Sequence, residues 1–190
     1  MKLLRKNFFM IRKSVVFLDR DGVINKKMPE GEYVKNWDQF HFLPGTLKAL
    51  KILKRSDFFI VIVTNQSCVS NGIISEENLK KMHCKMLTEI KKYGGNVDAI
   101  YFCPHTISDN CNCRKPNPGM ILKAINDLKK QGMQIDFQNS YMIGDSEVDI
   151  LAGKSVGLMT ISVRKYSKSS DFNKKNLLEA VEYILKKNTI

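Results

Sequence analysis

Short runs rich in apolar residues recur along the chain, and polar or charged residues follow each of them directly. The runs occupy 15–18, 58–63, 99–102 and 140–143. They do not alternate apolar with polar residues, which is typical of strands buried on both faces inside a parallel sheet. The pattern therefore predicts a buried sheet whose strands end in polar clusters.

Stretches with apolar residues at helical spacing separate and follow these runs. The predicted helices lie at 44–53, 75–92 and 118–128, directly after Asp145, and at 176–187. Pro44 and Pro118 are expected to open the first turn of their helices. The expected apolar faces of the first, third and last helices are Leu47, Leu50, Ile52 and Leu53; Ile121, Leu122, Ile125 and Leu128; and Leu177, Leu178, Val181, Ile184 and Leu185. Strands that alternate with helices predict a three-layer α/β fold with a mainly parallel sheet.

Length and charge bound the possible functions. With 190 residues we expect a single domain, 1–190, with its central part at about 14–163. The 31 Lys and Arg exceed the 19 Asp and Glu, a surplus that could attract nucleic acid, an acidic membrane surface or a phosphorylated small molecule. Much of it falls on predicted helix faces and both chain ends, including Lys2, Arg5 and Lys6, so we expect solvated surfaces. No apolar run has the length of a membrane span and no cleavage site follows the first residues, so we expect a cytoplasmic protein with no membrane partner.

Acidic and hydroxyl side chains gather where the predicted strands end. Asp19 and Asp21 follow the first strand, Thr64 and Asn65 the second, and Asp145 the fourth. In open α/β sheets, ligands bind at the carboxyl ends of the strands. A hydroxyl beside exposed backbone N–H groups can donate to phosphate oxygens, although a turn or helix cap would use the same residue types. These positions are therefore candidates for a phosphate site.

The segment 103–113 carries a second kind of chemistry. It contains three of the five cysteines and one of the three histidines, spaced as C-x-H-x5-C-x-C. Such a set is complete for tetrahedral zinc, and because it leaves no open position we expect a structural zinc that pins the loop. The expected Zn²⁺ ligands are Cys103, His105, Cys111 and Cys113. The remaining two cysteines stand apart, which fits a reducing compartment better than a disulfide framework.

Two adjacent cations, Arg114 and Lys115, follow this loop and precede Pro116 and Pro118. Adjacent cations are usually solvated. Here the loop on one side and the prolines on the other would hold them rigidly, and fixed cations stabilise the charge on a transferring phosphoryl group.

The order, residue types and strand context of these groups resemble the haloacid dehalogenase (HAD) superfamily of phosphatases, over roughly 15–163. The matching motifs are Asp19-x-Asp21-Gly22, then Thr64, then Lys115, and finally Gly144-Asp145 with Asp149. Segments 17–22, 64–67 and 113–120, with the Cys/His loop, resemble the subgroup of heptose-bisphosphate and histidinol-phosphate phosphatases. The resemblance implies a Rossmann-like, HAD-like fold without a cap domain, in which loops close the site.

The resemblance also implies catalytic and metal-binding roles. Asp19 is expected to be the nucleophile that forms an aspartyl-phosphate, and Asp21 the general acid and base. Catalytic Mg²⁺ is expected to be held by Asp19, Asp145 and the backbone carbonyl of Asp21, with Asp149 in support.

Substrate contacts are implied in the same way. Thr64, the N–H of Asn65 and Lys115 are expected to hold the phosphoryl oxygens. Arg114 could hold a second anionic group of the substrate. The remaining expected substrate-binding residues are Gln66 and Arg20.

The function implied is a Mg²⁺-dependent phosphomonoester hydrolase that removes the 7-phosphate of D-glycero-D-manno-heptose 1,7-bisphosphate, a small-molecule sugar phosphate. The alternatives are a histidinol-phosphate phosphatase, a nucleic acid 3′-phosphatase and a zinc- and phosphate-binding protein without catalysis. No RNA-binding aromatic motif, helix-turn-helix pattern or kinase P-loop supports a nucleic acid partner. We expect a monomer.

Some positions depart from the subgroup. Relatives often follow the second motif with Gly and then Arg or Lys before a further Gly, where this chain has Cys68, Asn71 and Gly72. After the fourth-motif Asp, heptose enzymes often have Lys, where this chain has Ser146. These departures bear on substrate identity and leave the core chemistry intact.

Overall fold

A parallel six-stranded sheet forms the centre of the protein in the computed structural model, which describes residues 11–188. The strand order is β4-β3-β2-β6-β7-β8, and every neighbouring pair is parallel. The strands of this sheet are β2 (Val15–Leu18), β3 (Phe59–Asn65), β4 (Ala99–Cys103), β6 (Tyr141–Gly144), β7 (Met159–Val163) and β8 (Phe172–Lys174). β1 (Ile11–Lys13) and β5 (Met133–Ile135) form a separate parallel pair. The predicted mainly parallel sheet is confirmed.

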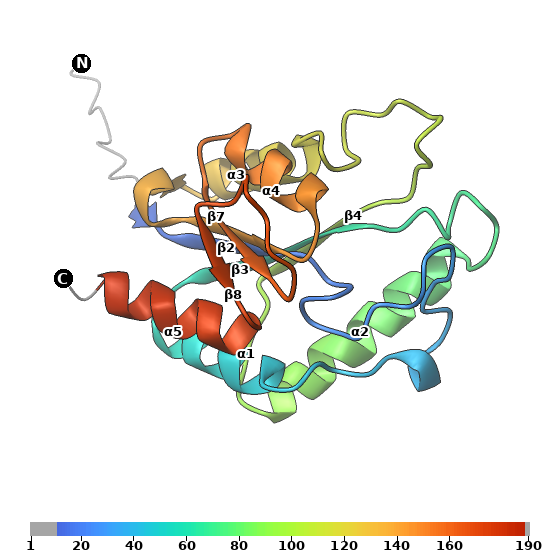
Figure 1. Cartoon of the computed structure of the whole chain (residues 1–190), viewed down its shortest axis with the longest axis horizontal. Coiled ribbons are helices and arrows are strands. Elements are labelled where there is room, and N and C mark those ends of the chain that lie inside the picture. Colours follow the sequence, from blue (N-terminus) through green and yellow to red (C-terminus); the bar gives the residue numbers. More distant parts are fainter. Residues whose placement is uncertain (1–10, 189–190) are drawn as a thin grey trace, which may run out of the picture.

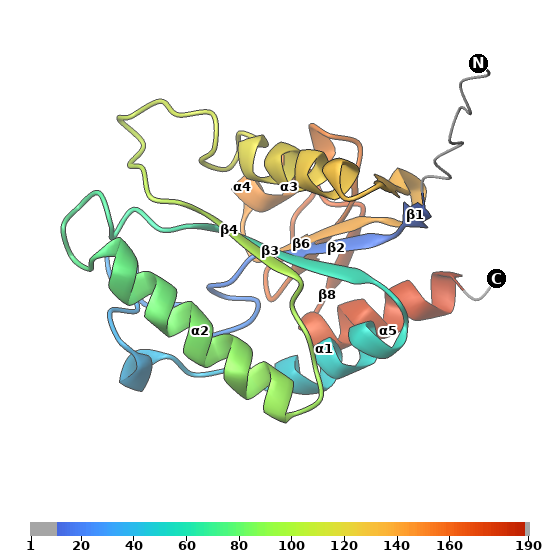
Figure 2. The ribbon, with the colours of Figure 1, turned by 180° about the vertical axis from the view of Figure 1, so that it is seen from behind.

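Helices cover both faces of the sheet (Figures 1 and 2). α1 (Thr46–Arg55), α2 (Glu76–Lys92) and α5 (Leu177–Asn188) lie on one face, and α3 (Gly119–Lys130) and α4 (Glu147–Lys154) lie on the other. Two short 3-10 helices, η1 (Trp37–Gln39) and η2 (Phe137–Asn139), lie in the connections. This is the predicted three-layer α/β arrangement.

The central strand β2 explains why the apolar runs are continuous. Val16 and Leu18 pack into the core that contains α1, α2 and α5, whereas Val15 and Phe17 pack into the core that contains α3 and α4. All four side chains are fully buried. A strand covered on both faces has no position for a solvated side chain, so its polar residues must come after it.

Several details differ from the sequence expectations. Leu122 is 45% exposed, so its predicted place on the apolar face of α3 is wrong. The buried residues of that face are Met120, Ile121, Ala124 and Leu128, and the predicted Ile125 packs against them. Neither Pro44 nor Pro118 is the first helical residue: Gly45 in a left-handed conformation precedes Thr46, and Pro118 is the N-cap residue before Gly119. The sequence analysis also missed β7, where buried Thr160 interrupts the apolar pattern and bonds Asp171 through its backbone N–H and its hydroxyl, both at 2.7 Å.

The parallel arrangement brings the carboxyl ends of the strands to one edge of the sheet. The connections after β3 and β4 extend from this edge (Figure 2). Among residues 11–188, no helix is long and apolar enough to cross a membrane. The expected basic residues Lys2, Arg5 and Lys6 lie outside the described residues.

Because α4 packs closely on the sheet, we expect replacement of a glycine in this helix by alanine to lower the free energy of unfolding, although alanine favours helix formation. Gly153→Ala should raise helix propensity by about 1 kcal/mol. The new Cβ would lie 2.6 Å from Cβ of Met142 and 3.0 Å from Cγ2 of Thr160, so we expect a net destabilisation of about 1–3 kcal/mol. Denaturant unfolding measures it, with Leu151→Ala on the exposed side of the same helix as control. A more stable Gly153→Ala variant would contradict the packing argument.

Candidate active site

A cavity of about 570 Å³ opens at the carboxyl edge of the sheet. Its lining comes from the ends of β2 and β3, the loop 27–34, the Arg114–Lys115 pair and the start of α4. The strand ends bring together residues from positions 19 to 149, as the sequence analysis expected. The loop 27–34 lies against the cavity because the chain turns back over the site after β2.

Lys115 is the centre of a buried ion-pair cluster. It is 4% exposed, and its Nζ lies 2.7 Å from Oδ1 of Asp19 and 2.6 Å from Oδ1 of Asp149. The same ammonium donates to the carbonyl of Val63 at 2.7 Å. Burial alone would lower the pKa of Lys115, but the Asp149 and Asp19 carboxylates outweigh it and raise that pKa. Lys115 is therefore a fixed positive charge in the wall of the cavity.

Asp19 is held by this cluster at the end of β2. Burial raises the pKa of Asp19, Lys115 opposes the shift, and the neighbouring carboxylates Asp149 and Asp21 add to it. The Lys115 ammonium donates a hydrogen bond to Oδ1 of Asp19.

Asp21 has a different environment, although it is only two residues away. Its carboxylate accepts hydrogen bonds from Arg20 at 3.0 and 2.8 Å, from Asn25 at 2.8 Å and from Gln66 at 2.8 Å. Burial would raise the pKa of Asp21, but the Arg20 charge and these hydrogen bonds lower it overall.

Two of the residues expected to bind substrate, Arg20 and Gln66, line the cavity but are almost fully buried. Arg20 is 1% exposed, and its guanidinium is bonded to Asp21 and His83. Gln66 is 2% exposed, and its amide donates to Asp21 and to the Thr64 hydroxyl. These bonds direct both side chains to Asp21 and so orient its carboxylate. The expected contacts of Arg20 and Gln66 with substrate stay predictions.

Asn65 joins two parts of the site. Its side-chain amide donates to the carbonyl of Lys115 at 3.1 Å, and its Oδ1 accepts from the backbone N–H of Lys115 at 3.0 Å. This reciprocal pair ties the end of β3 to the segment that carries the cations. The expected contact of the Asn65 backbone N–H with substrate stays a prediction.

Lys27 is a cation that the sequence analysis missed. Its Nζ lies 3.1 Å from Oδ2 of Asp145, and Lys27 itself lines the cavity. Burial raises the pKa of Asp145, and Lys27 opposes that shift. The adjacent pair Lys26 and Lys27 was a visible signal, but their loop has no periodicity that would show which of them turns inward.

A group of carboxylates could hold a metal ion. The side-chain oxygens of Asp19, Asp145 and Asp149 all lie within 4.8 Å of one another, and all three residues are buried. Oxygen donors of this kind suit a hard divalent cation. Asp149 forms an ion pair with Lys115 through Oδ1 and accepts hydrogen bonds from the backbone N–H and hydroxyl of Ser146 through Oδ2. These contacts fix its carboxylate beside Asp19 and Asp145.

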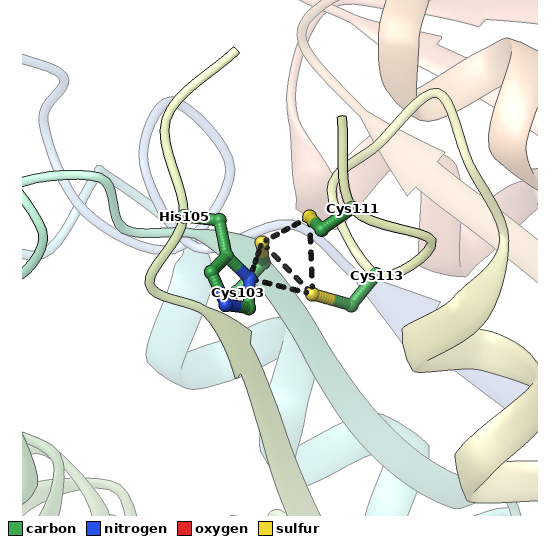
Figure 3. A group of neighbouring side chains, drawn as sticks. All are labelled: Cys103, His105, Cys111 and Cys113. Atoms are coloured by element: carbon green, nitrogen blue, oxygen red, sulfur yellow. Dashed lines mark hydrogen bonds between the residues drawn. The ribbon is translucent and has the colours of Figure 1, made fainter. Parts of the chain in front are cut away.

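The Cys/His loop brings its four predicted ligands to one point (Figure 3). Sγ of Cys113 lies 3.1 Å from Sγ of Cys103, 3.4 Å from Sγ of Cys111 and 3.2 Å from Nδ1 of His105. Ligand atoms around a tetrahedral ion with bonds of about 2.3 Å would be about 3.7 Å apart, so the four converge as closely as a metal site requires. Arg114 donates to the carbonyl of His105 at 3.0 Å, which links this cluster to the cavity.

Comparisons with known proteins place these features in a family. Residues 14–183 match the family described as "Polynucleotide kinase 3 phosphatase". The D-glycero-beta-D-manno-heptose-1,7-bisphosphate 7-phosphatase of Haemophilus ducreyi is 37% identical over 187 residues, covering 90% of this chain and 98% of the relative. A D-glycero-alpha-D-manno-heptose-1,7-bisphosphate 7-phosphatase of Mycobacterium bovis is 39% identical over 135 residues, covering 71% of this chain and 68% of the relative.

A solved structure of a heptose phosphatase has a similar fold. The crystal structure of D,D-heptose 1,7-bisphosphate phosphatase from B. bronchiseptica, complexed with magnesium and phosphate, superimposes with a TM-score of 0.82 at 30% identity. The superposition covers 92% of this chain and 99% of that one.

The site geometry predicts that a side chain at position 22 destabilises the fold. Gly22 has φ of +94°, and a Cβ there would collide with the carboxylate of Asp145. Gly31 has φ of +82° with open space around it, so Gly31→Ala carries only the backbone strain, about 1 kcal/mol. We expect Gly22→Ala to lower the free energy of unfolding by at least about 1 kcal/mol more than this control. Equal losses in denaturant unfolding would show that the collision is relieved without cost.

Proposed function

Because the chain belongs to the polynucleotide kinase 3 phosphatase family of HAD-type phosphatases, we propose that it hydrolyses a phosphate monoester through an aspartyl-phosphate on Asp19. The observation that carries the proposal is the ion-pair cluster: Asp19 and Lys115 lie 2.7 Å apart in the wall of a cavity at the carboxyl edge of the sheet. A cation fixed beside a buried carboxylate can hold the phosphoryl oxygens while that carboxylate attacks.

Asp19 is the nucleophile in this mechanism. Lys115 holds Oδ1, which leaves Oδ2 to form the bond to phosphorus as the bond to the leaving oxygen breaks. Thr64, the N–H of Asn65 and Lys115 contact the remaining phosphoryl oxygens. Mg²⁺, held by Asp19, Asp145 and the backbone carbonyl of Asp21, supplies neutralising charge when bound.

Asp21 donates the proton to the leaving oxygen and later accepts one from the attacking water. In the free site the Arg20 charge and hydrogen bonds lower the pKa of Asp21. A phosphate dianion placed beside this carboxylate raises its pKa again, because like charges disfavour the ionised form. Substrate binding itself therefore helps to protonate the general acid.

We propose D-glycero-D-manno-heptose 1,7-bisphosphate as the substrate, with loss of the 7-phosphate. The names of the relatives support the heptose, and the cations Lys27, Arg114 and Lys165 around the cavity support a substrate with a second phosphate. Relatives are named for each anomer, so both anomers are candidate substrates. The description of the matching family and the formal charge of +12 favour nucleic acid 3′-phosphate as the second candidate.

A substrate panel tests this assignment. Phosphate release with Mg²⁺ is measured from both heptose 1,7-bisphosphate anomers, histidinol phosphate and a 3′-phosphorylated oligonucleotide. We expect kcat/KM for one heptose anomer to exceed the other classes by at least about a hundredfold, roughly 2.7 kcal/mol of transition-state discrimination. Comparable slow turnover of all four would leave the HAD chemistry in place and reject the heptose.

Replacement of the nucleophile tests the mechanism. Asp19→Asn should lower kcat by at least about a thousandfold, because an amide cannot attack phosphorus, while Lys115 and the other phosphate contacts remain and phosphate binding is retained. Asp38→Asn, on an exposed carboxylate outside the cavity, is the control. Unchanged turnover in Asp19→Asn would reject the aspartyl-phosphate and favour a binding protein without catalysis.

We propose that Cys103, His105, Cys111 and Cys113 hold a structural zinc ion. Their donor set is soft and closed, which suits a tetrahedral ion that fixes a loop. We also propose a cytoplasmic location and a monomeric state. None of the five cysteines, all within residues 11–188, forms a disulfide, which fits a reducing compartment.

Metal analysis checks the zinc. The purified protein should contain about one zinc per chain, and Cys113→Ser should lower this content together with the thermal midpoint of unfolding. Cys84→Ser, an exposed cysteine outside the cluster, should change neither. A Cys113→Ser variant with full zinc content would remove Cys113 from the ligand set.

A further inference from the structure

A line of polar side chains runs from the middle of α2 to Asp21. His83 on α2 is 5% exposed, and its Nε2 lies 3.1 Å from Nη1 of Arg20. The other terminal nitrogen of Arg20, Nη2, donates to both carboxylate oxygens of Asp21 at 3.0 and 2.8 Å. One guanidinium therefore connects the imidazole of a helix to the carboxylate at the end of the central strand.

Arg20 depends on these two contacts. Its side chain is 1% exposed, and within residues 11–188 its hydrogen-bond partners are Asp21 and His83, while Nε has none. A buried guanidinium is stabilised only where its charge and N–H groups are matched. The rotation of the planar group is set by Asp21 at one corner and by His83 at the other.

The direction of the bond to His83 follows from its chemistry. Arg has donors and no acceptor, so Nε2 of His83 must accept and the ring proton must lie on Nδ1. Burial and the charge of Arg20 lower the pKa of His83 to about 3, which keeps the ring neutral near pH 7. The ring also packs edge-on against Phe102, with centroids 6.1 Å apart. His83 is thus a fixed, neutral acceptor.

We propose that His83 is a positioning residue for the proton transfer: it fixes the Arg20 guanidinium, which in turn orients Asp21 toward the leaving oxygen. This inference rests on the proposed role of Asp21 as general acid. When the bond between phosphorus and the leaving oxygen breaks, the proton moves from Asp21 to that oxygen, and the proton on His83 stays in place. His83 contacts neither substrate nor metal in this role.

The test uses leaving groups that differ in their need for a proton. Phenyl phosphate and 4-nitrophenyl phosphate have similar size, but 4-nitrophenolate leaves readily without protonation. His83→Leu, which removes the acceptor, should lower kcat/KM for phenyl phosphate by about tenfold and for 4-nitrophenyl phosphate by less than about twofold. His83→Gln, which keeps an acceptor at a similar distance along the side chain, should restore both. The two esters carry no sugar, so the result does not depend on the heptose assignment.

The ratio of kcat/KM for phenyl phosphate to kcat/KM for 4-nitrophenyl phosphate, measured in one preparation, does not depend on the fraction of active protein. Met86→Leu, a buried substitution on α2 that offers Arg20 no nitrogen or oxygen, controls for repacking and should leave the ratio unchanged. If His83→Leu does not fold, His83→Asn is measured in the same way. Asn is polar, but its shorter side chain places its acceptor out of reach of Arg20.

Asp21→Asn separates the two possible failures. It should show the same leaving-group dependence as His83→Leu, with a larger loss of about a hundredfold for phenyl phosphate. Equal losses for both esters in His83→Leu, or no loss, would overturn the positioning role while the Asp21 result stands. Absence of leaving-group dependence in Asp21→Asn would overturn the general acid itself, and the inference with it.

Discussion

The pairing of the buried Lys115 ammonium is the interaction on which the site depends. Its three acceptors come from different elements: Asp19 at the end of β2, Val63 in β3 and Asp149 in α4. A buried charge is tolerated only with such partners, and loss of one leaves the others uncompensated. The cluster therefore holds distant parts of the chain in register, and the geometry that stabilises Lys115 is also the geometry of the site.

Asp19 and Asp21 show how one short segment can provide two different carboxylates. Burial raises the pKa of Asp19, even against the opposing charge of Lys115. Arg20 and neutral amide donors lower the pKa of Asp21. Environments that shift two neighbouring carboxylates in opposite directions are typical of sites in which the two groups have different roles.

Hydrogen bonds also connect the Cys/His cluster to the segment that carries Lys115. Arg114 donates to the carbonyl of His105, and Asn117 donates to the carbonyl of Cys111 at 2.9 Å. Asn65 then braces the backbone of Lys115 through two hydrogen bonds. A metal-fixed loop would therefore restrain the cation of the site through a short series of contacts, which gives the loop a structural part in positioning Lys115.

The sequence by itself determined the four buried strands β2, β3, β4 and β6, the polar groups at their ends and the Cys/His cluster within 103–113. Each of these follows from local spacing, because a strand covered on both faces must be continuously apolar and the three Cys and one His lie within eleven residues. Only the tertiary structure decided that Arg20 faces His83 and Asp21, and that Lys27 reaches Asp145, 118 positions away. Periodicity reports which face of an element is buried, but the partner of a buried polar group depends on which elements become neighbours when the sheet forms.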